Sequence, residues 1–280
     1  MINYNIREPT DKEIIKCIAV LYSAFNRALP VNIKEEEKIW KALIKGEIGK
    51  FLVSEEKGKI FGIGGVFLFE KVSSFGYMAV LPEYRGKGIG TQIFTNLLKI
   101  AHNMNCETMI LYASKLGKPI YETFGFQDRF YGIMHQFPKH IPNFGFQSKN
   151  VKVLENLPEW TLTLDKNAMG FNRRRYLNLK VKLGGKVLVI ENEGYGLLVN
   201  KRLGPLIAIN QDAALQIINK GIIMGANHII IANHKYFPKK IIKSLKLVEN
   251  KDGASLKMVY GKELSEKLDF LYGIGTYAKG

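Results

Sequence analysis

Val80-Leu81-Pro82-Glu83-Tyr84-Arg85-Gly86-Lys87-Gly88-Ile89-Gly90 stands between two segments of regular pattern. Tyr77–Leu81 before it is typical of a strand, and after it apolar residues recur at helical spacing from Ile89 to Ala101. Glycines that lead from a strand into a helix expose backbone N–H groups at the positive end of the helix dipole, which favours phosphate. The order R-x-x-G-x-G differs from both G-x-x-x-x-G-K-[ST] and G-x-G-x-x-G. The sequence therefore predicts a phosphate-binding turn that belongs to neither of these two motif classes.

This motif resembles the pyrophosphate arm of the GNAT superfamily of acyl-CoA N-acetyltransferases. Met78-Ala79-Val80-Leu81-Pro82-Glu83-Tyr84 is similar to the fourth strand of that family, and Tyr121-Glu122-Thr123-Phe124-Gly125-Phe126 is similar to its Y-E-x-x-G-F ending. Motifs in the right order and at the right separation are more specific than either motif alone. The resemblance implies a mixed-sheet α/β fold whose central strands splay apart, and acetyl-CoA as co-substrate without a metal.

The pattern of the first half predicts the order β-α-α-β-β-β-α-β-α-β, and 1–140 is predicted to be the acetyltransferase domain. We expect strands at 3–7, 50–54, 60–69, 75–81 and 108–113, helices at 11–27, 34–44, 90–104 and 119–124, and a pair of closing strands within 126–137. Gly62-Ile63-Gly64-Gly65 lies inside a predicted strand, so it indicates a bulge or a close backbone approach.

Periodicity breaks near 139–150, and a second domain is predicted at 148–280. Strands are expected at 186–191, 196–198, 205–210, 227–232 and 255–260, and helices at 212–224 and 238–245. This order repeats that of the first half in degraded form. Asn210-Gln211-Asp212-Ala213-Ala214 stands where the glycine motif would be, so the second domain is predicted to be GNAT-like without a coenzyme loop. The whole chain resembles a two-domain GNAT group with a YitH-like C-terminal domain.

The resemblance also implies roles for individual residues. Backbone groups of Met78, Ala79 and Val80 are expected to face the pantetheine arm of the coenzyme. The diphosphate is expected on the amides of Gly86, Lys87, Gly88, Ile89, Gly90 and Thr91, with Arg85 assisting. Ser114 stands where the family often has a coenzyme-binding asparagine. Tyr121 matches the position that gives a proton to the departing thiolate, which suits a phenol with a pKa near ~10.

The general base is left unassigned by the sequence. Met109 stands where some family members carry a glutamate. The candidates are Glu70, Tyr112, a chain of water molecules and the terminal carboxylate of Gly280.

Composition limits the remaining choices. Apolar residues make up 46% of the chain with only 9 prolines, which favours globular cores. The absence of a long apolar run and of a leader-like N-terminus predicts a cytoplasmic protein that does not enter the membrane. The two cysteines, Cys17 and Cys106, fall among apolar residues and are expected to be unreactive. The five histidines lack the spacing of a metal site.

The net charge of +16 is uneven, with +5 on residues 1–147 and +11 on residues 148–280. A basic surface without a specific partner is favoured over a nucleic-acid partner, because the densest basic cluster, Arg173-Arg174-Arg175, is short and has no accompanying RNA-binding motif.

Two functions from different classes remain. The first is direct transfer of an acetyl group from acetyl-CoA to a primary amine of a small molecule or peptide, with the second domain lining the acceptor site or forming a homodimer. The alternative is a non-catalytic acyl-CoA sensor whose basic second domain binds nucleic acid or a protein.

Overall fold

The computed structural model describes residues 4–138, 150–235 and 238–278. The chain forms two compact units, Met1–Ile110 and Leu111–Ala278, and each is described by itself. The predicted boundary at 139–150 falls almost wholly outside the described residues, so the domain limits 1–140 and 148–280 remain predictions.

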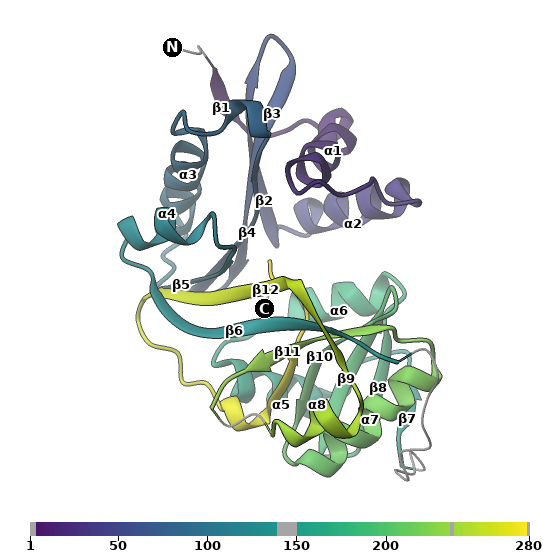
Figure 1. The fold of residues 1–280 in the computed structure, drawn as a ribbon. Coiled ribbons are helices and arrows are strands. Elements are labelled where there is room, and N and C mark those ends of the chain that lie inside the picture. Colours follow the sequence, from purple (N-terminus) through teal and green to yellow (C-terminus); the bar gives the residue numbers. More distant parts are fainter. Residues whose placement is uncertain (1–3, 139–149, 236–237, 279–280) are drawn as a thin grey trace. The chain divides into compact units, whose positions relative to one another are not determined.

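The first unit contains an antiparallel sheet in the order β1-β2-β3-β4 (Figure 1). Its strands are β1 (Asn5–Arg7), β2 (Gly49–Glu56), β3 (Lys59–Phe69) and β4 (Val72–Val80), and β5 (Thr108–Ala113) begins in this unit. The helices α1 (Ile14–Ala24) and α2 (Ile33–Lys45) cover one face, and α3 (Ile89–Asn103) covers the other (Figure 1).

Glycines in β3 let α3 pack directly on the sheet. A Cβ atom on Gly64 would come within 2.8 Å of both Ile93 and Leu97 of α3, and a Cβ on Gly62 would lie 3.0 Å from Ile93. The register between β3 and β4 also shifts between Ile63 and Gly65. Of the two alternatives predicted for Gly62–Gly65, a bulge or a close backbone approach, the structure shows the close approach in β3 and a register shift beside it.

The bulge lies at Tyr77 of β4, which has a φ of +57°. Its ring packs on Trp40, Phe51 and Phe67, with centroid separations of 4.8, 5.8 and 5.7 Å. Aromatic pairs of this kind contribute about 1 kcal/mol each beyond the burial of their surface. This aromatic cluster holds the C-terminal part of β4 in place, just before the chain enters the glycine turn.

The second unit contains a mixed sheet in the order β12-β6-β11-β13-β10-β9-β8-β7. Its strands are β6 (Gln127–Gln136), β7 (Lys152–Leu154), β8 (Lys186–Ile190), β9 (Gly194–Val199), β10 (Arg202–Ala208), β11 (His228–Asn233), β12 (Val248–Gly261) and β13 (Leu271–Ile274). β6 pairs with β12 on one side and with β11 on the other, both antiparallel. The last strand of the first half therefore lies inside the sheet of the second half.

The helices of the second unit are α4 (Lys118–Thr123), α5 (Glu159–Met169), α6 (Arg174–Lys182), α7 (Gln211–Ile223) and α8 (Lys240–Ser244). In β9, Tyr195 bonds Asp165 of α5, whereas a Cβ on the next residue, Gly196, would touch Ile217 of α7. Because neighbouring residues of a strand face opposite sides, α5 and α7 cover opposite faces of this sheet.

The element order of the first half recurs along the described residues of the second. The run β1-α1-α2-β2-β3-β4-α3-β5-α4-β6 corresponds to β7-α5-α6-β8-β9-β10-α7-β11-α8-β12, and β13 follows. The predicted α/β class and the predicted repeat are confirmed. The prediction missed β7, α5, α6 and β13, and it was wrong about the closing pair of strands, since residues 127–136 form one strand.

Candidate active site

The glycine turn leaves β4 at Val80, passes through a 3-10 turn at Pro82–Tyr84 and enters α3 at Ile89. Gly86 and Gly88 have φ values of +73° and +75°, and a Cβ atom at either position would find no atom within 4 Å. Their backbone conformation, and not crowding, therefore requires glycine. The space beside the turn is open.

The turn presents a row of backbone donors. Within the described part of the chain, the N–H groups of residues 86–91 have no hydrogen-bond acceptor. Gly88 is the N-cap of α3 and provides no side chain to cap the helix. Free N–H groups at the positive end of a helix dipole are an anion-binding arrangement, so the turn fits the diphosphate of a coenzyme.

Arg85 has a bracing role that the sequence did not indicate. Its Nε donates to the carbonyl oxygen of Val80 at 3.0 Å, and its Nη2 donates to that of Ala24 at 2.6 Å. The guanidinium thus ties the turn to the end of β4 and to the end of α1. These two bonds hold the glycine turn in place, and the predicted assistance to the diphosphate remains a prediction.

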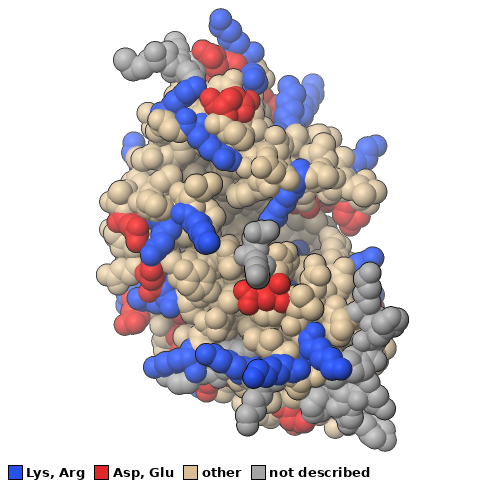
Figure 2. Space-filling view, viewed as in Figure 1, with Lys and Arg blue, Asp and Glu red and all other residues tan. Residues whose placement is uncertain are grey.

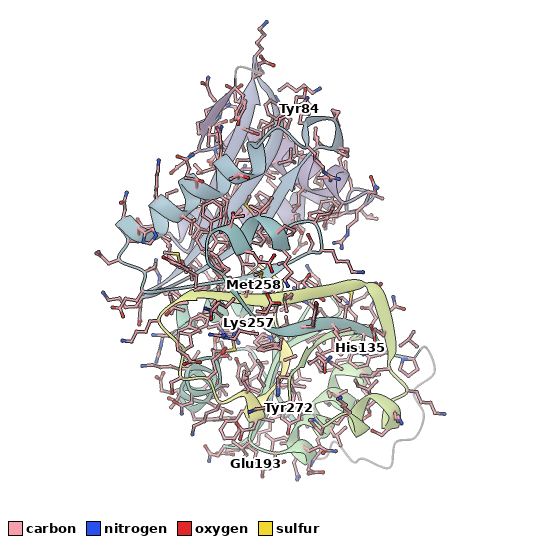
Figure 3. The ribbon with its side chains drawn as sticks, turned by 60° about the vertical axis from the view of Figure 1, so that its left-hand side comes forward. Tyr84, His135, Glu193, Lys257, Met258 and Tyr272 are labelled. Atoms are coloured by element: carbon pink, nitrogen blue, oxygen red, sulfur yellow. The ribbon has the colours of Figure 1, made fainter. Side chains whose placement is uncertain are left out.

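Two lysines lie beside the turn, at Tyr84 (labelled in Figure 3). The Tyr84 ring stacks on Phe61 with 4.2 Å between centroids, and the ammonium groups of Lys59 and Lys87 lie 5.1 and 5.4 Å from the centre of that ring. Lys59 lies at the start of β3, far from the glycine motif in the sequence, so the motif did not predict that this lysine is near the turn. Together they add positive charge where the turn is open.

Met78, Ala79 and Val80 occupy the end of β4 beyond the bulge. Ala79 and Val80 are opposite Ile63 and Gly62 of β3, and the Met78 sulfur lies against Gly64. Tyr77 points to α2 whereas Met78 lies on the α3 side of the sheet, because successive residues of a strand face opposite sides. Their predicted contact with the pantetheine arm remains a prediction.

Ser114 and Tyr121 lie together in the second unit. The N–H of Gly117 donates to Ser114 Oγ at 3.2 Å, and a Cβ atom on Gly117 would be 3.5 Å from both Ser114 Oγ and the Tyr121 hydroxyl. Burial raises the pKa of Tyr121, so the phenol is protonated at neutral pH. A protonated phenol is the form that donates to a leaving sulfur.

Neither of the two candidates for a general base that the structure describes is suited to accept a proton at this site. Glu70 is exposed in the turn between β3 and β4, and it precedes Met78 by eight residues, roughly 25 Å along an extended strand. Burial raises the pKa of Tyr112, which keeps its hydroxyl neutral and unable to accept a proton. Gly280 lies outside the described residues.

The basic cluster of the second half is partly used inside the fold. Arg173 is buried and paired with Asp165 at 2.8 Å, and Arg174 pairs with Glu159. Figure 2 shows Lys and Arg side chains in a row on one face. Arg173 therefore adds nothing to the basic surface, whereas Arg174 and Arg175 of the same cluster are exposed.

Reactive thiols, metal ions and membrane-spanning helices are other features that a protein of this size could carry. Both cysteines are buried, and burial raises the pKa of Cys17 to about 12, as expected for unreactive thiols. Among the residues that the structure describes, no group of three or more His, Cys, Asp and Glu side chains is arranged to hold a metal ion. No described helix is long and apolar enough to cross a bilayer.

Comparison with known proteins gives two family matches. A model described as an acetyltransferase (GNAT) domain matches residues 47–128, and a second model of the same description matches residues 161–273. The first match contains the glycine turn and Tyr121, and the second contains most of the repeat described above.

Individual relatives agree with these matches. A crystal structure of an acetyltransferase candidate from Pyrococcus horikoshii is 30% identical, covers 100% of this chain and 97% of its own, and has a TM-score of 0.91. A GCN5-related N-acetyltransferase from Sphaerobacter thermophilus has a TM-score of 0.64 at 13% identity, with 94% of this chain and 98% of that one covered, and this likeness concerns the fold alone.

An uncharacterized N-acetyltransferase of Bacillus subtilis, YitH, is 28% identical over 179 residues, which are 58% of this chain and 61% of that protein. The chain thus spans about three fifths of the length of this curated relative. The sequence-based resemblance, including its two-domain form and its fold, is confirmed by these findings. The chain belongs to the GNAT acetyltransferase family, of which it carries two domains in tandem.

Proposed function

We propose that this chain transfers the acetyl group of acetyl-CoA directly to a primary amine of a small molecule or peptide. One observation carries the proposal: the N–H groups of residues 86–91 lack acceptors among the described residues and lie at the start of α3, inside the first GNAT match. That arrangement suits the diphosphate of coenzyme A. The second repeat has no such turn, so we propose one coenzyme site per chain.

In this proposal the acetyl group passes directly from coenzyme A to the amine, and the protein forms no covalent bond with either. The amine nitrogen attacks the thioester carbon, a C–N bond forms as the C–S bond breaks, and the thiolate takes up a proton. We assign that proton to the Tyr121 hydroxyl, with Ser114 beside it. An amine attacks only when it is unprotonated, so we propose that the acceptor reacts as its free-amine fraction and that its surplus proton passes to solvent.

The test is release of free thiol from acetyl-CoA across an amine library. Tyr121→Phe should bind acetyl-CoA as the wild type does and lose about 100-fold in kcat, in the range expected for removing a general acid. Tyr131→Phe, which changes an exposed tyrosine of the same unit, should leave both quantities unchanged. Undiminished turnover by Tyr121→Phe removes its role, and an absence of acetyl-CoA binding by the wild type removes the function.

Two finer features belong to the same proposal. We place the protein in the cytoplasm, because two unpaired buried thiols suit a reducing compartment. We also propose that the second domain either lines the acceptor site or forms the interface of a homodimer. The sensor alternative gains no support from the structure, since two of the three clustered arginines are held by carboxylates within the fold.

A further inference from the structure

The arginine of the glycine turn directs most of its donors into the fold. Arg85 donates from Nε and Nη2 to the carbonyl oxygens of Val80 and Ala24 at 3.0 and 2.6 Å. Two of the three guanidinium nitrogens are therefore occupied by the protein itself. A ligand with more negative charge than the backbone donors can balance would need cations from outside this arginine.

Two such cations gather around Tyr84, which lies in the same turn (Figure 3). The Nζ atoms of Lys59 and Lys87 are 5.1 and 5.4 Å from the centre of the Tyr84 ring, within the range of cation–π attraction. Phe61 stacks on this ring, with 4.2 Å between the centroids and 4° between the planes. One ring, fixed by Phe61, thus holds two ammonium groups from distant parts of the sequence, which we call the lysine pair.

The lysine pair remains available to a ligand. Lys87 Nζ donates to the carbonyl oxygen of Glu83 at 3.0 Å, and an ammonium group has two further N–H donors. In the part of the chain that the structure describes, neither lysine of the pair forms an ion pair with a carboxylate, whereas Lys41 and Lys71 of the same unit do. The ring and the backbone bond hold these cations before a ligand arrives, which lowers the entropy cost of binding one.

The lysine pair lies beside the row of backbone donors. Lys87 contributes its own N–H group to the row at residues 86–91, while its side chain returns to the Tyr84 ring. Tyr84 precedes Gly86 by two residues, so their Cα atoms are at most about 7 Å apart. A ligand whose phosphate is bound by the row would therefore have the lysine pair next to it.

Coenzyme A has two kinds of phosphate group. Its diphosphate joins the pantetheine arm to the adenosine, and a separate phosphomonoester is attached to the 3′ oxygen of the ribose. A phosphomonoester carries about −1.5 to −2 charges at pH 7, and ammonium groups serve as point charges for such an anion. Because only the ribose separates the two groups, the 3′-phosphate of a coenzyme bound by the donor row has to lie close to the turn.

We propose that Lys59 and Lys87 bind the 3′-phosphate of coenzyme A, so that the chain selects acetyl-CoA over an acetyl thioester that lacks this phosphate. The proposal rests on the function proposed above and assigns which part of the coenzyme gives it specificity. The division of labour follows from chemistry: neutral N–H dipoles of the turn accept the diphosphate, and full positive charges accept the more highly charged phosphomonoester.

Two matched ligands test the proposal by binding alone. Calorimetry compares acetyl-CoA with acetyl-3′-dephospho-CoA, which differs only by the missing phosphate, and no acceptor amine is present. The wild type should bind acetyl-CoA tighter by about 10-fold or more, as expected for charge-assisted hydrogen bonds to a phosphate. High salt should reduce this preference, because the lysine pair is exposed and its charges are screened.

Substitutions then assign the preference to the lysine pair. Lys59→Gln and Lys87→Gln should each weaken acetyl-CoA binding and leave acetyl-3′-dephospho-CoA unchanged, and the double variant should bind the two ligands within about 2-fold of each other. Lys59→Arg should retain most of the preference, because arginine keeps both the charge and the contact with an aromatic ring. Both lysines are exposed, so these variants should fold as the wild type does.

Lys99→Gln is the matched control for net charge. Lys99 is an exposed lysine of α3, ten residues and roughly 15 Å from the start of that helix. Its substitution removes the same charge away from the turn and should leave both affinities at their wild-type values. Equal effects of Lys99→Gln and Lys59→Gln would mean that net charge, and not a local contact, explains the preference.

The outcomes separate this inference from the proposed function. Tight binding of both ligands with equal affinity by the wild type overturns the 3′-phosphate site and leaves the transferase intact. Equal losses for both ligands in the lysine variants would place these side chains on the diphosphate and also overturn the inference. Binding of neither ligand by the wild type defeats the proposed function, and the inference with it.

Discussion

The turns that follow β4 and β10 occupy the same place in the repeated order, but they satisfy their helices differently. Eight residues, 81–88, separate β4 from α3, whereas only Ile209 and Asn210 separate β10 from α7. At α3 the N-cap is Gly88, which supplies no side-chain bond. At α7 the side chain of Asn210 accepts the N–H of Ala213 at 2.8 Å.

Asn210 is itself anchored, since its amide donates to Glu193 at 3.2 Å. One helix start is thus completed by the side chain of its N-cap residue, and the other has N–H groups without acceptors among the described residues. A helix begins with N–H groups that need acceptors from somewhere. The comparison shows how one architecture keeps its strands and helices while the length and capping of a single turn change.

The largest expected effect comes from closing the open turn. Gly88→Glu places a carboxylate where the coenzyme diphosphate is proposed to bind and strains a φ of +75°. Acetyl-CoA binding, measured by calorimetry, should weaken at least 100-fold.

Gly225→Glu in the second unit is the matched control. Gly225 has a φ of +92°, and a Cβ there would also find no atom within 4 Å, so the backbone strain is similar. Its acetyl-CoA affinity should equal that of the wild type. Equal losses in both variants would mean that strain, and not the turn, explains the result.

A smaller effect is expected from opening the capped turn. Asn210→Ala removes the bond to the Ala213 N–H and should lower the free energy of unfolding by about 1 kcal/mol, the usual value of an N-cap. Urea unfolding measures it, and Asn210→Ser, which can still cap, should recover most of the loss. Acetyl-CoA affinity should not change. A drop in affinity would show that the second turn also serves the coenzyme.

The smallest expected effect is a decrease in the stability of the second unit at acidic pH. Burial and the charge of Arg202 lower the pKa of His228 to about 4, and burial lowers those of His135 and His234, all in the second unit. A histidine whose pKa is lower in the folded state stabilises the fold above about 6.5, and that contribution declines as the pH falls toward the folded value. The stability of the second unit should therefore decrease between pH 7.5 and 5.

For His228 we expect roughly 1 kcal/mol after allowing for solvent screening. Urea unfolding at the two pH values should show a smaller decrease for His228→Gln than for the wild type. In the first unit, the Arg7 hydrogen bond holds the pKa of Glu13 at about 2, so its contribution is lost only as the pH falls from about 4.3 through 2. An identical pH dependence in wild type and His228→Gln would remove His228 as the cause.

The glycine turn could be predicted because local sequence determines it. Alternate glycines, the preceding strand and the amphipathic α3 pattern act within some thirty residues, and the structure follows them. The role of Arg85 could not be predicted, because its partner Ala24 is 61 residues away in sequence.

The missed elements have local patterns that conflict with their structures. In α6, Tyr176-Leu177-Asn178-Leu179-Lys180-Val181 alternates like a strand, yet it forms a helix next to the buried Arg173–Asp165 pair. Residues 126–137 were predicted to form a pair of strands, but 127–136 form the single strand β6, which contains Gly132. A Cβ there would approach Ile274 to 2.8 Å and Tyr277 to 3.0 Å, so glycine allows close packing within one strand.

The position of β6 has a consequence for how the chain is made. Its partners β11 and β12 begin about 90 and 110 residues after β6 ends. At about 5–20 residues per second, the ribosome delivers β11 roughly 5–20 s after β6 has been synthesised. During that interval both edges of β6 await partners, and an unpaired edge is a site for pairing with other chains. The first half of this protein thus completes its closing strand only after the second half has been translated.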